Sequence, residues 1–125
     1  MTTETDSNDL SFDAAGIGCK TAWVIRRQSA AIVGTQLWAI ELDVHWCYAF
    51  GVVRTIDYNY GVACCGPAWS FDRWIETDLP PAGPASVTSF VQAQFKYSVA
   101  WFQGGKAPWI KITVNGDGTA TRTWG

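Results

Sequence analysis

The sequence has little charge and no long apolar run. Charged residues make up 16% of the 125 residues, and nine Lys and Arg against eleven Asp and Glu leave a formal net charge of -2 with no basic cluster. Nucleic-acid binding depends on clustered cations, so we expect no nucleic-acid partner. No run of about 18 apolar residues occurs, which predicts that no segment spans a membrane.

Recognised catalytic and cofactor motifs are also missing. The sequence holds no P-loop, dinucleotide fingerprint or zincin motif, and no nucleophile elbow. It has one histidine, His45, and no C-x-x-C spacing, so we expect no cofactor and no metal. These absences predict that the protein is not an enzyme.

One group of residues leaves a remote enzymatic alternative, a metal-dependent hydrolase. Glu41, Asp43 and His45 stand at alternate positions of one predicted strand and so share one side of it. Two acids and an imidazole could bind a cation or transfer protons. Alternating polar residues opposite an apolar row are also typical of a solvated sheet face, which we favour.

Aromatic residues are abundant: eight Trp, six Phe and four Tyr in a chain that is 48% apolar. This composition and length predict one folded domain. Residues 1–13 hold four acids and no base, so we assign them to an acidic N-terminal tail and residues 14–125 to the domain. The tail has no secretory-signal pattern, so either a signal was removed before this numbering or none is made.

Apolar and polar residues alternate with the period of β-strands, and no stretch has helical spacing. A Pro-rich loop at 79–84 interrupts the pattern, and an Asn-Gly-Asp-Gly turn at 115–118 predicts a C-terminal hairpin. The predicted strands are 21–27, 36–50, 52–60, 69–77, 86–102, 109–114 and 119–124. We therefore expect an all-β, single-domain antiparallel β-sandwich or small barrel of about six to eight strands.

Four cysteines, Cys19, Cys47, Cys64 and Cys65, favour disulfides and an oxidising compartment. The alternatives are buried free thiols in a cytosolic protein and, less favoured, a metal site. The residues leave the pairing open: Cys19 with Cys47 and Cys64 with Cys65, or crossed pairs.

A pattern of Gly, Cys and Trp along residues 17–120 resembles a group of small uncharacterised secreted proteins of actinobacteria. It comprises Gly18-Cys19-Lys20, Leu37-Trp38, Trp46-Cys47-Tyr48, Trp69-Ser70-Phe71, Gln94-Phe95, Pro108-Trp109-Ile110, Val114 and Asp117-Gly118-Thr119. The resemblance implies an exported β-sandwich with a Cys19–Cys47 disulfide and no established activity. The chain departs from the group in its missing signal peptide and in the adjacent Cys64-Cys65 pair. We therefore expect an extracellular protein, with a cytoplasmic or virion location as alternatives.

The tryptophans divide by strand face. Trp38, Trp46, Trp69 and Trp101 alternate with aliphatic residues and are predicted to lie in the core, while Trp23 and Trp124 are unassigned. The predicted ligand-binding residues are aromatics on polar faces and their polar neighbours: Trp74, Trp109, Phe90, Gln92, Gln94 and Asp72. Rings beside amides and carboxylates suit a polysaccharide or a cell-surface component, and equally a protein interface. The alternatives are that these rings are buried too, or that a phage or envelope structural protein self-associates through them.

Overall fold

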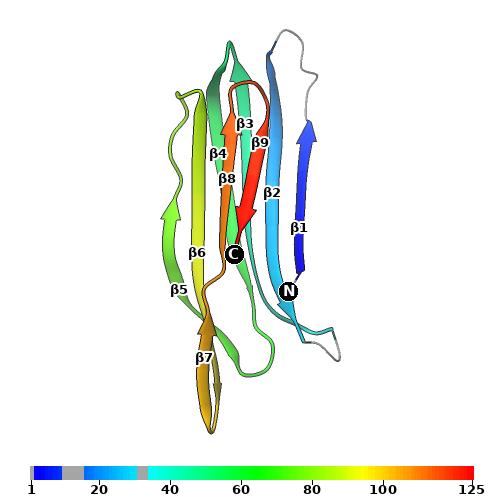
Figure 1. Ribbon diagram of the computed structural model, residues 1–125, viewed down its shortest axis with the longest axis vertical. Coiled ribbons are helices and arrows are strands. Elements are labelled where there is room, and N and C mark those ends of the chain that lie inside the picture. Colours follow the sequence, from blue (N-terminus) through cyan, green and yellow to red (C-terminus); the bar gives the residue numbers. More distant parts are fainter. Residues whose placement is uncertain (1, 10–15, 31–33) are drawn as a thin grey trace.

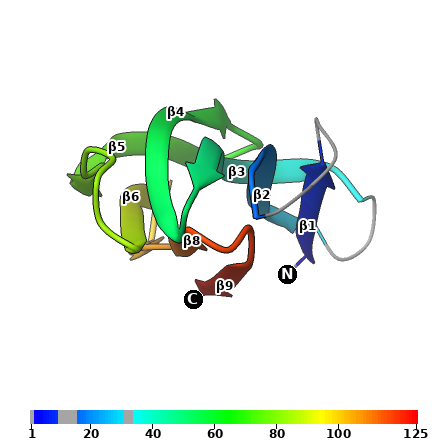
Figure 2. The same ribbon diagram turned by 90° about the horizontal axis from the view of Figure 1, so that it is seen from above.

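The computed structural model describes residues 2–9, 16–30 and 34–125, and every regular element in these ranges is a β-strand (Figure 1). The strands form two antiparallel sheets that lie against each other, as the view from above shows (Figure 2). The predicted all-β sandwich is therefore confirmed. The described residues include no helix of the length and apolar character that would cross a membrane.

The first sheet has the strand order β1–β2–β3–β4, so each strand pairs with its sequence neighbour. Its strands are β1 (Thr2–Asp9), β2 (Gly18–Ser29), β3 (Gln36–Ala49) and β4 (Val52–Cys64). The acidic segment assigned to a tail thus supplies an edge strand, whose backbone pairs with Lys20–Arg27 of β2. The predicted boundary between residues 13 and 14 lies outside the described residues.

The second sheet has the order β5–β6–β8–β9, with β7 also paired to β6. Its strands are β5 (Trp69–Asp78), β6 (Ser86–Val99), β7 (Phe102–Lys106), β8 (Trp109–Asn115) and β9 (Ala120–Trp124). The predicted hairpin at the C-terminal end is present as β8–β9. Its turn is closed by Asp117, whose carboxylate accepts hydrogen bonds from the backbone N–H and the hydroxyl of Thr119 at 3.0 and 2.6 Å.

The core lies between the sheets and is built from the apolar row of each central strand. Trp38 and Trp46 of β3 are fully buried there, as predicted, and Trp38 stacks on Phe95 of β6 with ring centroids 5.1 Å apart. The indole N–H of Trp46 donates to the carbonyl of Asn115 at 3.1 Å, which joins the two sheets. Burying a large apolar side chain contributes roughly 1.5–3 kcal/mol, so this layer dominates the stability.

The disulfides are Cys19–Cys47 and Cys64–Cys65, so the uncrossed pairing is the one that the protein adopts. Cys19 and Cys47 stand directly opposite each other in β2 and β3. This bridge is the one that the family resemblance implies. Cys64–Cys65 joins the last residue of β4 to the residue that follows it.

The predicted strand 86–102 is two strands, and this corrects the placement of Trp101. Val99 pairs with Phe102, so the chain reverses at Ala100 and Trp101. Trp101 is 87% exposed instead of buried. Trp101 belongs to the same alternating row of side chains as Phe95. Phe95 packs on Trp38, which is only two residues from the start of β3, so little of the first sheet remains beyond it to cover Trp101. The apolar row therefore continues past the end of the first sheet.

Candidate functional site

The outer face of the second sheet, which points away from the first sheet, brings together four of the predicted binding residues. On β6, Phe90, Gln92 and Gln94 alternate with the fully buried Val91, Ala93 and Phe95. Successive side chains of a strand point to opposite faces, so the first three residues point outward. Trp109 of β8 lies directly opposite Gln92 and joins them.

Phe90 and Trp109 form a stacked aromatic pair across β6 and β8. Their ring centroids are 5.8 Å apart and their planes differ by 27°. Trp109 exchanges two backbone hydrogen bonds of 3.2 Å with Gly125, and its indole occupies the space that a Cβ at Gly125 would need. The glycine therefore leaves room for the ring against the sheet, and both aromatic side chains stay partly exposed.

The two glutamines fix the neighbouring backbone. The amide nitrogen of Gln92 donates to the carbonyl of Ala107 at 3.0 Å. That of Gln94 donates to the carbonyls of Phe95 and Lys106 at 3.0 and 3.3 Å. These bonds tie β6 to Lys106 at the end of β7 and to Ala107 after it, and they orient both amides, which leaves the amide oxygens as acceptors.

A hollow of about 530 Å³, lined mainly by polar residues, continues this face toward the β6–β7 hairpin. Gln94 belongs to its lining, so the hollow adjoins the row that carries Phe90 and Gln92. A Cβ at Gly105 would lie 2.7 Å from the carbonyl oxygen of Phe95 and 2.8 Å from the Gln94 amide, so only glycine lets β7 approach here. The hollow is lined by Ser70, Gln94, Lys96, Tyr97, Ser98, Gln103, Gly104 and Gly105.

Asp72 forms ion pairs with two cations, one of which, Lys96, lines the hollow. Asp72 is the extra residue of a β-bulge between Phe71 and Arg73. Its carboxylate lies 2.8 Å from the guanidinium of Arg73 and 3.4 Å from the ammonium of Lys96. Both cations are well exposed, so the contacts orient the group and stabilise the fold little.

Trp74 is not on the outer face, contrary to the strand alternation. The bulge at Asp72 shifts the alternation by one residue, so Trp74 turns inward and packs against the core. Its ring meets Tyr60 edge-on, with centroids 5.0 Å apart, and lies 5.9 Å from Phe71. The structure therefore separates Trp74 from the Phe90–Trp109 pair.

The acidic row of β3 lies on the outer face of the first sheet, far from these residues in the fold. The His45 ring nitrogen Nδ1 lies 2.9 Å from the hydroxyl of Thr21 on β2. Burial, with the charge of Glu41 second, raises the pKa of Asp43. Over residues 16–30 and 34–125, no three His, Cys, Asp or Glu side chains are grouped so as to hold a metal ion. Nothing at this row supports the metal-dependent alternative.

Several residues of the hollow and the hairpin were missed by sequence reasoning. Apolar alternation runs unbroken through Ala100 and Trp101, so it does not mark the turn. The Gly104-Gly105 pair, a usual turn and strand-breaking signal, could have indicated that the predicted strand ends early and that the chain returns close to itself.

In comparisons with protein-family models, curated proteins and solved structures, no match to this chain was found.

Proposed function

We propose that this protein is a non-catalytic binding module that works outside the cell and holds a polysaccharide on the outer face of its second sheet. The observation that supports this most is the position of the Phe90–Trp109 pair on the same face as a hollow of about 530 Å³ that is lined mainly by polar residues. Gln92 follows Phe90 along β6, and the next residue on this face, Gln94, lines the hollow.

Sugar chemistry fits this combination. A pyranose offers an apolar C–H surface and a rim of hydroxyls, so it binds best where aromatic rings adjoin fixed hydrogen-bonding groups. Phe90 and Trp109 supply the rings. Gln94, Ser98 and Gln103 supply amides and hydroxyls that are held on paired strands. The amides of Gln92 and Gln94 are already fixed by hydrogen bonds, and groups that are ordered before binding lose little conformational entropy when the ligand arrives.

The disulfides support an extracellular location. Cys19–Cys47 crosses two neighbouring strands, and bridges of this kind persist in oxidising compartments. An exported protein of this size meets polysaccharides of the cell envelope and its surroundings. The location and the ligand class are therefore proposed together.

Affinity electrophoresis through gels that contain soluble β-glucan, xylan or peptidoglycan fragments tests the proposal. We expect at least one polysaccharide to retard the protein, and Trp109→Ala to weaken that binding by about two- to tenfold, since an aromatic stacking contact is worth roughly 0.5–1.5 kcal/mol. Gln94→Ala and Gln103→Ala should weaken it as well.

Trp124→Ala is the matched control. Trp124 is also a partly exposed tryptophan of this sheet, but it pairs with the buried Ile110 and so belongs to the opposite face. Its removal should leave retardation unchanged. Equal loss in the Trp109 and Trp124 variants, or no retardation by any of these polysaccharides, would refute binding at the outer face.

Self-association is the second candidate function, and exposed rings at both ends of the sandwich favour it. Phe50 is 77% exposed in the β3–β4 turn, and Trp101 and Phe102 are exposed at the opposite end. Large exposed apolar groups are often covered in assemblies. Light scattering over a concentration series would favour this function if the mass rises in steps, and would oppose it if the mass stays at that of one chain.

A further inference from the structure

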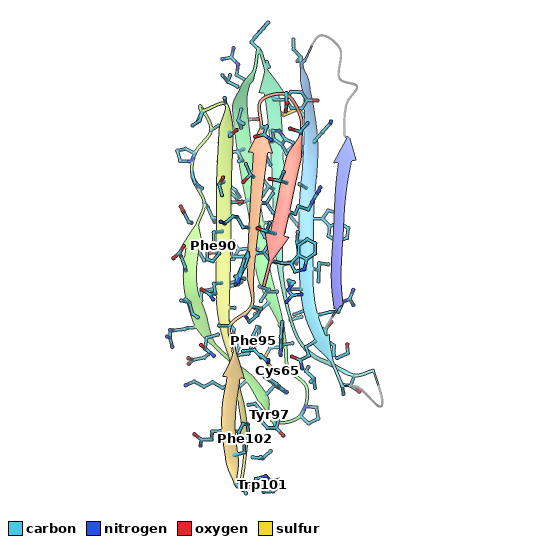
Figure 3. All side chains as sticks on the ribbon, viewed as in Figure 1. Cys65, Phe90, Phe95, Tyr97, Trp101 and Phe102 are labelled. Atoms are coloured by element: carbon cyan, nitrogen blue, oxygen red, sulfur yellow. A yellow bond between two sulfur atoms is a disulfide. The ribbon has the colours of Figure 1, made fainter. Side chains whose placement is uncertain are left out.

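The β6–β7 hairpin projects beyond the rest of the sandwich and ends in exposed aromatic residues (Figures 1 and 3). We define the hairpin tip as residues 99–102, in which Val99 pairs with Phe102 and the chain turns at Ala100 and Trp101. Trp101 is 87% exposed and Phe102 is 55% exposed. No other described tryptophan has comparable exposure.

A continuous series of ring contacts fixes the tip to the core. Tyr97 lies 6.1 Å from Phe102 and 5.3 Å from Trp69, measured between ring centroids. Trp69 packs against the core cluster. The Phe102 ring also covers Gly104, where a Cβ would lie 2.9 Å from it. The exposure of Trp101 therefore belongs to a paired, braced hairpin.

The hairpin is cationic although the chain is not. Residues 95–106 contain Lys96 and Lys106 and no acid, while the whole chain has a net charge of -2. Arg73 adds a third cation near the hairpin. Asp72 forms ion pairs with Arg73 at 2.8 Å and with Lys96 at 3.4 Å. The base of the hairpin therefore keeps a positive balance.

We propose that the hairpin tip inserts into the interface of a lipid bilayer with anionic headgroups. Trp and other aromatic rings favour the boundary between headgroups and acyl chains. Lys96 precedes Val99 by three residues along β6, so it lies about 10 Å from the tip at roughly 3.3 Å per residue. A tip buried to the depth of the boundary thus brings the lysines to the headgroups, within the range of unscreened attraction.

The shape of the tip favours a bilayer over the polysaccharide bound by the outer face. A sugar needs a flat or hollow surface with amides beside the ring, whereas the tip is convex and its turn residues are Ala100 and Trp101. A fluid bilayer accepts a convex wedge without a complementary pocket. This contact is separate from the proposed polysaccharide site, and either can fail alone.

Sedimentation with vesicles tests the proposal. We expect the protein to bind vesicles of phosphatidylcholine with phosphatidylglycerol more tightly than phosphatidylcholine alone. Trp101→Ala should weaken binding about tenfold or more. Lys106→Gln should reduce the preference for the anionic vesicles. Phe50→Ala is the control, since it removes another highly exposed ring, 77% exposed, at the opposite end of the sandwich and should leave vesicle binding unchanged.

Three further measurements keep the outcome unambiguous. Trp101→Ala should melt at the wild-type temperature, because the side chain is almost entirely exposed. Lipids brominated on their acyl chains should quench tryptophan fluorescence in the wild type and not in Trp101→Ala, and Trp109→Ala should bind vesicles normally. Wild-type protein that stays in the supernatant, or equal binding by Trp101→Ala, overturns the proposal. A dimer that Trp101→Ala dissociates, without vesicle binding, would assign the tip to a second copy instead.

Discussion

Tyr58 has surroundings that disfavour the ionised form of its hydroxyl. The group donates a 2.7 Å hydrogen bond to the carbonyl of Pro80, and the ring packs against the core. Burial, with the negative charge of Asp78 second, raises the pKa of Tyr58 from 10.0 to about 12. The folded state therefore keeps this proton where the unfolded state has lost it, so the stability that Tyr58 contributes is present below pH 10.0 and is lost as the pH rises toward about 12.

A spectrophotometric titration should show a late phase of tyrosine ionisation near pH 12 that includes Tyr58. In Tyr58→Phe that late phase should lose the amplitude of one tyrosine, because the Tyr58 hydroxyl is removed. The variant should also lose less stability than the wild type between pH 10 and 12. A late phase of unchanged amplitude in Tyr58→Phe would contradict the assignment.

At the scale of elements, the β8–β9 turn is held by a charge. The hydrogen bonds from the hydroxyl and the backbone N–H of Thr119 lower the pKa of Asp117 below its ordinary value of 3.8. A lowered folded pKa means that the carboxylate stabilises the folded state above pH 3.8, and that this contribution is lost as the pH falls through the folded value.

Asp117→Asn keeps the length and an acceptor oxygen of the side chain but removes its charge. We expect its urea midpoint to lie below that of the wild type at neutral pH and the two midpoints to converge in acid. Thr119→Val should weaken the turn and reduce the pH dependence of the difference. A gap between Asp117→Asn and the wild type that is the same at every pH would contradict a role for the charge.

The bridge between β2 and β3 restricts the unfolded chain. Cys19 and Cys47 are 28 residues apart, and the chain-entropy relation gives a stabilisation of about 3–4 kcal/mol for a loop of that length. Urea unfolding of the Cys19→Ser, Cys47→Ser double variant should show a loss near this value.

The adjacent pair offers the control for that loss. Cys64→Ser with Cys65→Ser opens a bridge between sequence neighbours, which encloses no loop and restricts the unfolded chain little. Its unfolding free energy should fall much less. Equal losses in the two double variants would refute the loop-entropy explanation.

Local alternation predicted most strands of this fold but not where their faces shift. The two rows of β3 match the predicted ones, with Trp38 and Trp46 buried. In β5 one extra residue at Asp72 reverses the face of Trp74, and no residue pattern marks that bulge. The backbone of Thr2–Asp9 pairs with β2 although its acidic composition indicates a solvated segment. Pairing between strands, which depends on distant residues, decided both points.

At the scale of the whole molecule, strand alternation could predict one part of the candidate site and not the other. Phe90, Gln92, Gln94 and Trp109 could be placed on one face because they lie on regular strands with a correct alternation. The hollow could not be predicted, since it arises where β7 returns beside β6. The exposure of Trp101 depends on where the first sheet ends, which is a property of two sheets together.

The outer face of the second sheet is the centre of this account, and the indole N–H signals of the tryptophans in a ¹H–¹⁵N spectrum test it most directly. On titration with the polysaccharide fragments that retard the protein, we predict that the signal of Trp109 shifts, while those of the buried Trp38 and Trp46 stay in place. A saturating titration that moves other indole signals and leaves Trp109 unchanged would contradict the account.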